Sequence, residues 1–66
     1  MKHELTKREK EIISVLVTGK SNDEIGKELH VSVNTVRTHL ANCYKKVKVK
    51  NRIELIIKYI NEKQKL

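Results

Sequence analysis

The sequence contains no proline, phenylalanine or tryptophan, and its 66 residues include two glycines and one cysteine. The lone cysteine, Cys43, cannot form an intrachain disulfide, so no oxidising compartment is required and a cytoplasmic location is expected. No apolar run approaches the roughly 20 residues that span a bilayer. The N-terminal stretch "MKHELTKREKE" is too charged for a signal peptide. We therefore expect no membrane partner.

Acidic residues are scarce relative to basic ones. Fifteen lysines and arginines stand against eight aspartates and glutamates, and the net charge of +7 favours a polyanionic partner: DNA, RNA or an anionic membrane. The chain has room for one small domain over residues 1–66, with a core at 5–61 and frayed ends. It has no Gly-rich phosphate loop, no catalytic carboxylate pair and no metal-site spacing among its histidines and cysteine. We expect neither an enzyme nor a cofactor or metal.

Local signals predict helices joined by short turns. Thr6 and Ser21 each stand three residues before a glutamate, which is the spacing of a capping box at a helix start. Ser32 and Asn51 can cap two further helices, and Gly19 can stop the first one in a left-handed conformation. The sequence therefore predicts an all-α domain with four helices, at about 7–18, 22–29, 33–47 and 52–61.

Apolar residues recur at helical spacing in all four segments and define the expected core. Cys43 is expected to be a small buried hydrophobe, and His39 a hydrogen-bonded packing residue. The expected inward residues are Ile12, Ile13, Val15, Leu16, Val17, Ile25, Leu29, Val33, Val36, Leu40, Cys43, Tyr44, Val47, Ile53, Ile56, Ile57 and Ile60.

The fourth helix carries a second apolar stripe, formed by Leu55 and Tyr59 at positions i and i+4. A domain this small needs one stripe for its core, so the other would be exposed in a monomer. We interpret Leu55 and Tyr59 as a dimer interface. The alternative is that both complete the core, with the tyrosine hydroxyl reaching water.

The stretch "SVNTVRTHLANCYK", residues 32–45, has a polar side without any acid, and no acid occurs between Asn34 and Lys50. From periodicity alone this side could be an ordinary solvated face, a membrane-surface helix or a surface for an anionic ligand. The absence of Trp and Phe disfavours the membrane. The lack of aromatic residues placed to stack exposed bases disfavours RNA.

Only His30 and Val31 separate the second and third helices, which leaves room for nothing but an angular turn. This arrangement fits a helix-turn-helix unit. His30 occupies a turn position often held by glycine, and histidine is among the residues that tolerate a positive φ. The apolar and small positions of the unit are filled by Ile25, Gly26, Leu29, Val31 and Val36.

Four segments together resemble the DNA-binding domain of the LuxR type, also called the GerE type. They are "LTKREKEII" at 5–13, "GKSNDEIGKEL" at 19–29, "VSVNTVRTHLANCYKKV" at 31–47 and "VKNR" at 49–52. Gly26 stands where this family usually has alanine, and Lys48 stands where a glycine often precedes the last segment.

The resemblance implies a bacterial transcription regulator whose third helix enters the major groove and whose fourth helix pairs with that of a second subunit. Members usually carry a receiver or ligand-binding domain ahead of this one, and the start "MKHELTKRE" favours a free-standing regulator over an excised domain. The implied partners are double-stranded DNA, a second copy of the chain, and RNA polymerase or another regulator.

The polar side of the third helix supplies the candidate base contacts, which are Asn34, Arg37, Thr38 and Ala41. Arg37 is the leading one because its guanidinium matches guanine O6 and N7, while Thr38 and Ala41 can offer methyl groups to thymine. Lys46 and Lys48 add positive charge nearby. The candidate phosphate contacts are Ser21, Asn22, Thr35, Asn42, Lys45, Lys50, Asn51 and Arg52.

A second function remains open at this point. The chain could be a protein-interaction module that pairs through its fourth helix with a related regulator and modulates it without reading DNA. The basic third helix favours sequence-specific DNA binding.

Overall fold

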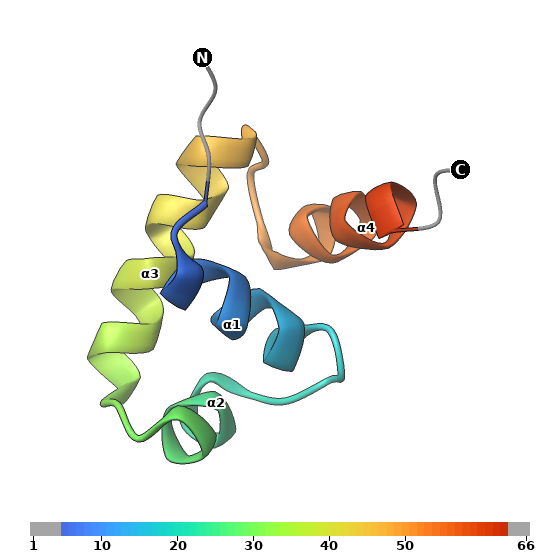
Figure 1. Cartoon of the computed structure of the whole chain (residues 1–66). Coiled ribbons are helices and arrows are strands. Elements are labelled where there is room, and N and C mark those ends of the chain that lie inside the picture. The colour runs from blue at the N-terminus through green and yellow to red at the C-terminus, as the bar shows by residue number, and fades with distance from the viewer. Residues whose placement is uncertain (1–4, 64–66) are drawn as a thin grey trace.

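The computed structural model describes residues 5–63, which form four helices and no strand (Figure 1). The helices are α1 (Lys7–Leu16), α2 (Asn22–Leu29), α3 (Val33–Val47) and α4 (Arg52–Lys63). The predicted all-α class and the bounds of the second and third helices are confirmed. Apart from residues 61–63, which continue α4, the ends predicted to fray lie outside the described residues.

The first helix ends two residues earlier than predicted, at Leu16. The N–H groups of Thr18 and Gly19 bond to carbonyls three residues back, and the Thr18 hydroxyl donates to the carbonyl of Val15 at 2.6 Å. These bonds tighten the chain into a turn. Gly19 then takes the positive φ of 99° expected of a stop signal, two residues beyond the C-cap Val17.

The helices start as the capping residues predict. Thr6 and Ser21 each form a complete capping box, Ser32 caps α3, and Asn51 accepts the N–H of Glu54 at the start of α4. Each cap satisfies backbone N–H groups that the first helical turn leaves without a partner.

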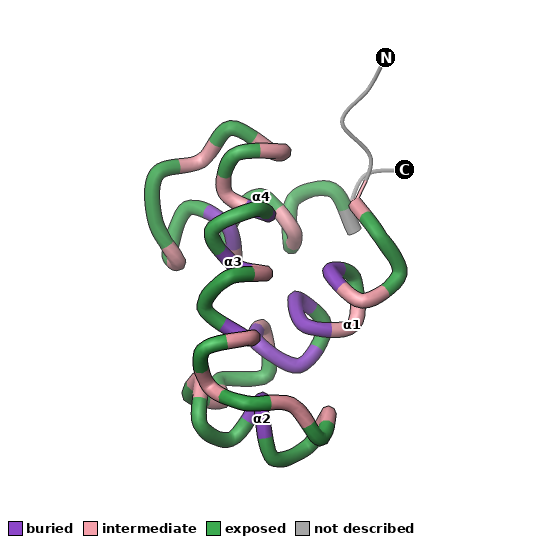
Figure 2. The backbone as a smooth tube through the Cα atoms, turned by 90° about the vertical axis from the view of Figure 1, so that its left-hand side faces the viewer, coloured by how far each residue is buried: buried purple, intermediate pink, exposed green. Residues whose placement is uncertain are grey.

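The helices α1, α2 and α3 pack against one another, and α4 packs against α3 (Figure 1). The buried segments of the tube in Figure 2 face the space between them. The buried apolar side chains are Ile12, Ile13, Val15, Leu16, Ile25, Val36, Leu40, Cys43 and Leu55. One core therefore connects the four helices.

Two expectations about the core were wrong. Val33 is half-buried and lines a surface groove instead of joining the core cluster. The two stripes of α4 are exchanged: Leu55 is buried at 2% exposure, whereas Ile53, Ile57 and Ile60 are 68%, 52% and 42% exposed. Both stripes have helical spacing, so only the docking of α4 on α3 decides which one is covered.

The other members of the α4 stripes lie between these extremes. Tyr59 and Ile56 are half-buried and pack against the core. Leu55 and Tyr59 therefore do not form the exposed apolar surface that a dimer interface requires. The alternative reading, in which both complete the core, describes the monomer correctly.

The turn between α2 and α3 depends on two unusual positions. His30 adopts the left-handed conformation with φ 61°, as its turn position predicts, and its N–H bonds to the carbonyl of Gly26. The N–H of Val31 bonds to the same carbonyl at 2.9 Å. A Cβ atom at Gly26 would lie 2.6 Å from the carbonyl oxygen of Val31, so the turn packs directly on this glycine.

Candidate nucleic-acid interface

The third helix has one buried and one exposed side. Its buried side carries Val36, Leu40 and Cys43. Every side chain predicted to contact bases is exposed on the other side, together with two of the predicted phosphate contacts: Asn34, Arg37, Thr38, Ala41, Asn42 and Lys45. This surface contains hydrogen-bond donors, methyl groups and two cations, and no acidic residue.

At the start of α3, side-chain bonds fix the first turn. The Ser32 hydroxyl accepts the N–H of Thr35 at 3.0 Å and lies 2.9 Å from the Thr35 hydroxyl. One turn later, the guanidinium of Arg37 points toward Asn34, whose Oδ1 is 3.5 Å from Nη1. Thr35 is half-buried, so the exposed Arg37 and Asn34 are the residues most open to a ligand here.

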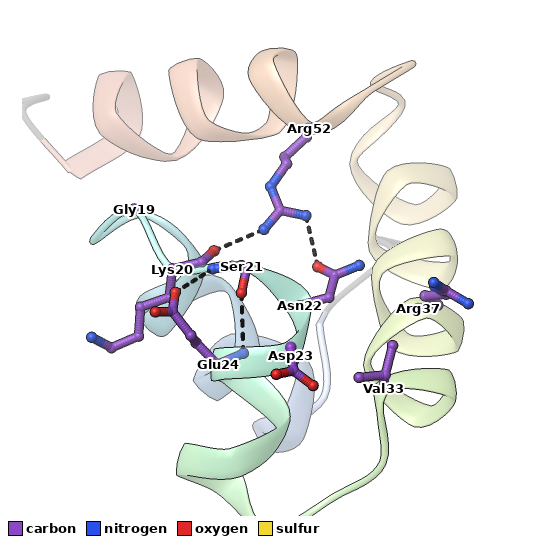
Figure 3. A pocket seen from close by; sticks show the side chains of 9 residues that line it. All are labelled: Gly19, Lys20, Ser21, Asn22, Asp23, Glu24, Val33, Arg37 and Arg52. Carbon is purple, nitrogen blue, oxygen red and sulfur yellow. Dashed lines mark hydrogen bonds between the residues drawn. The ribbon is translucent and has the colours of Figure 1, made fainter.

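A shallow groove lies beside this surface, between the starts of α2, α3 and α4 (Figure 3). Arg52 reaches into it from the first position of α4. One of its Nη atoms donates to Asn22 Oδ1 at 2.7 Å, and the other donates to the carbonyl of Lys20 at 2.9 Å. The groove is lined by Gly19, Lys20, Ser21, Asn22, Asp23, Glu24, Val33, Arg37 and Arg52.

The structure brings together three predicted phosphate contacts, Ser21, Asn22 and Arg52, at this groove. All three already have partners within the protein. The Ser21 N–H donates to the Glu24 carboxylate at 2.9 Å, and this bond is the largest cause that lowers the pKa of Glu24. Their contacts with phosphate stay a prediction, and nothing in the sequence indicated that Arg52 and Asn22 bind each other.

Lys50 and Asn51 do not line the groove. The backbone N–H of Lys50 donates to the Glu54 carboxylate at 2.8 Å, and the Asn51 side chain caps α4. Both residues are exposed. Among residues 5–63 the ammonium groups of Lys45 and Lys50 form no ion pair, so both are available to an anion.

The sequence predicted only one of the two hydrogen bonds that the buried Glu9 carboxylate accepts. Glu9 is buried, and its carboxylate accepts hydrogen bonds from the Lys46 ammonium and the Thr6 N–H, each at 2.8 Å. Burial raises the pKa of Glu9, but the bonds from Lys46 and Thr6 together outweigh it, so the pKa lies below 4.5. The capping box predicted the Thr6 bond, whereas nothing local connects Glu9 with Lys46, which was expected to add to the basic surface.

The remaining reactive side chains have structural environments. Cys43 is fully buried, and this burial raises the pKa of its thiol to about 11, as expected for a small apolar residue. His39 is half-buried, and the hydrogen bond expected for it is absent at Nδ1, which has no partner in the described chain. Over residues 5–63 no cluster of His, Cys, Asp or Glu could hold a metal ion, and no helix could cross a bilayer.

Comparison with known proteins identifies the unit that these helices form. A family model described as bacterial regulatory proteins, luxR family, matches residues 3–59. The chain belongs to the luxR family. It therefore has the helix-turn-helix DNA-binding domain of a family of transcription regulators, not of enzymes. The resemblance inferred from the four sequence segments is confirmed.

Individual relatives of the luxR-family chain differ in length. It is 54% identical over 52 residues to the CsgBAC operon transcriptional regulatory protein of Escherichia coli, a match that covers 79% of this chain and 24% of that protein. It is 41% identical over 56 residues to the spore germination protein GerE of Bacillus subtilis, covering 85% of this chain and 76% of GerE. The chain thus spans about a quarter of the first relative and about three quarters of the second.

Proposed function

We propose that this domain binds double-stranded DNA sequence-specifically as a homodimer, with α3 in the major groove and α4 at the subunit interface. The observation that carries the proposal is the exposed, acid-free side of α3, opposite the side that is buried in the core. An α-helix fits the major groove, where each base pair presents a distinct pattern of donors and acceptors. A rigid helix held by its buried side is suited to such reading.

The base contacts in this proposal are Asn34, Arg37, Thr38 and Ala41. Arg37 reads guanine through its two terminal N–H groups. Asn34, whose Oδ1 lies 3.5 Å from Arg37 Nη1, either steadies that guanidinium or contacts adenine itself. Thr38, next to Arg37, and Ala41, about one turn beyond it, present methyl groups on the same exposed side.

The phosphate contacts surround this reading surface. Asn42, Lys45 and Lys50 are exposed and supply direct ligands. At the helix starts, Ser21, Asn22, Thr35 and Asn51 supply side-chain hydroxyl and amide donors, because the backbone N–H groups of Ser21 and Thr35 are used within the protein. If each subunit neutralises about four to five phosphates, a dimer gives a slope of log K against log salt of about −7 to −9.

The dimer interface in this proposal is the exposed stripe of α4, formed by Ile53, Ile57 and Ile60. These residues recur at i, i+4 and i+7, so they lie along one side of the helix. Three exposed isoleucines on a short helix are unfavourable in water, and pairing two identical stripes about a two-fold axis would bury them. This stripe replaces Leu55 and Tyr59 as the proposed contact.

A regulator bound to DNA in this way would act in the bacterial cytoplasm, and RNA polymerase or another regulator is its proposed further partner. The same exposed stripe would also serve a module that pairs with a related regulator without reading DNA. The basic side of α3 has no role in that second function.

Selection of bound duplexes from a random pool, with the mass of each complex measured alongside, tests the proposal. We expect one enriched half-site, present twice per duplex, with two chains bound. Equal binding of all duplexes would reject sequence reading, and one chain per duplex would reject the homodimer. If Ile57→Lys abolished regulation while Arg37→Ala had no effect, the interaction module would be the correct function.

A further inference from the structure

The fourth helix is attached to the rest of the domain at few points. Leu55 is its only fully buried side chain among the described residues, and Ile56 and Tyr59 are half-buried beside it. A short helix with one buried and two half-buried side chains has few core contacts that fix its direction. Its orientation should therefore depend also on polar contacts outside the core.

Arg52 provides such a polar attachment, three residues before Leu55. Its two Nη atoms donate to Asn22 Oδ1 at 2.7 Å and to the carbonyl of Lys20 at 2.9 Å (Figure 3). The two acceptors flank Ser21, the N-cap of α2, so the guanidinium links the first residue of α4 to the start of α2. A planar guanidinium bound to two acceptors resists rotation better than a single point charge does.

We propose that Arg52 is a positioning residue that fixes the orientation of α4 relative to α2 and α3, and that it thereby sets the half-site spacing accepted by a dimer. The second part rests on the proposed homodimer through α4. In such a dimer the two-fold axis passes between the paired α4 helices. A rotation of α4 within each subunit therefore changes the angle between the two α3 helices by twice that rotation. Half-site spacing on DNA follows from the separation of those helices.

Arg52 was also predicted to contact a phosphate, and the two roles predict different effects of replacing it. Two of the five N–H donors of the guanidinium are used for Asn22 and Lys20, so three remain that a phosphate could accept. If Arg52 is a phosphate ligand, its loss would reduce the slope of log K against log salt by about 0.9 per subunit and leave the preferred spacing unchanged. As a positioning residue, its replacement changes the preferred spacing and leaves the salt slope unchanged.

The first part of the proposal can be tested on the protein alone. Residual dipolar couplings of the amide groups report the orientation of α4 relative to α3 in the wild type, Arg52→Gln, Arg52→Lys and the control Lys58→Gln. Lys58 is exposed on α4, and its replacement removes the same charge as Arg52→Gln. We expect reorientation in Arg52→Gln, a smaller one in Arg52→Lys and none in Lys58→Gln. Identical orientations in all four proteins would overturn the proposal.

Circular dichroism shows which variants fold. If Arg52→Gln is unfolded, Arg52→Lys decides, because it keeps the charge and one donor. An unfolded Arg52→Lys domain would also contradict the proposal, since the buried core, Leu55 included, is left intact and only the orientation of α4 should change.

The second part is tested with duplexes that carry two selected half-sites at graded spacings. We expect wild type and Lys58→Gln to prefer one spacing, and Arg52→Lys to accept a broader range while its affinity for a single half-site is unchanged. A smaller salt slope with the same sharp spacing preference would show a phosphate ligand instead. If the wild type binds no duplex selectively or shows no spacing preference, the proposed function fails, and the dipolar couplings still decide the role of Arg52 within the subunit.

Discussion

The ammonium of Lys46 lies 2.8 Å from the carboxylate of Glu9 and joins the last turn of α3 to the first turn of α1, 37 residues away in sequence. The same carboxylate oxygen accepts the N–H of Thr6, and the Glu9 side chain is 4% exposed. A carboxylate this deeply buried keeps its charge because both donors are in place.

Replacing Lys46 by Met should lower the free energy of unfolding by about 1–2 kcal/mol, because Glu9 loses a charged donor while it stays buried. The effect is below that of a fully buried pair because Lys46 is 30% exposed. Lys45→Met removes the same charge from an exposed neighbour and should change stability by less than about 0.5 kcal/mol. Urea unfolding at pH 7 makes the comparison, and equal effects would contradict the account.

Acid should weaken the fold through Glu9. Its pKa is below 4.5 in the folded protein, so its contribution to stability is complete above pH 4.5 and is lost as the pH falls through the lowered folded value. In Lys46→Met this pKa rises, and stability should therefore change less steeply with acid. Urea midpoints measured from pH 6 down to pH 3 should show this difference, and parallel curves would exclude Lys46 as a cause.

A glycine at position 48 should stabilise the domain. Lys48 ends α3 in the left-handed conformation with φ 61° and ψ 48°, where a side chain is strained and glycine is not. The gain from Lys48→Gly is about 0.5–1 kcal/mol after the greater flexibility of unfolded glycine is subtracted. Lys48→Val, which adds a β-branch at the same φ, should destabilise. Thermal melts that rank the three proteins in any other order would contradict the assigned strain.

Alanine at position 26 should destabilise the domain by about 1 kcal/mol even though alanine favours helices over glycine by a similar amount. The new Cβ would lie 2.6 Å from the Val31 carbonyl oxygen, so the α2–α3 turn would have to move. Glu28→Ala, at an exposed site on the same helix, should be nearly neutral. A Gly26→Ala protein more stable than wild type would show that the turn moves freely.

Mutations in the two stripes of α4 should have different effects, one on the stability of the monomer and the other on dimer formation. Leu55→Ala removes a core side chain and should cost about 2–4 kcal/mol of stability. Ile57→Lys alters a side chain that is 52% exposed and should leave the monomer stable while it abolishes dimers. Urea unfolding and light scattering measure the two effects. A dimer that persists in Ile57→Lys would require another interface.

The sequence predicted those features that depend on neighbours in the chain. Both capping boxes, the Asn51 cap and the left-handed turn at His30 involve residues three or four positions apart, so their spacing alone indicates the bond. The exposed side of α3 was also predictable, because its apolar residues keep one helical period and only one side of a surface helix can be buried.

Features that depend on how the helices dock could not be predicted from the sequence. The stripes of α4 are equally periodic, and nothing local reveals that the core covers Leu55 and not Ile57. The bonds from Arg52 to Asn22 and Lys20 join residues 30 and 32 positions apart. Arg52 and Asn22 were predicted as phosphate contacts, and the spacing of the two residues gave no sign of the hydrogen bond between them.

The central claim is that the exposed side of α3 reads DNA sequence, and the ratio of affinities for a selected duplex and for bulk DNA tests it most directly. Arg37→Ala should reduce this ratio, because each half-site loses one base-reading side chain. Each such contact contributes about 1–3 kcal/mol of discrimination between sequences. Lys45→Ala should weaken binding to both DNAs equally and reduce the salt slope by about 0.9 per subunit. An unchanged ratio in Arg37→Ala, measured beside Lys45→Ala at one salt concentration, would contradict the claim.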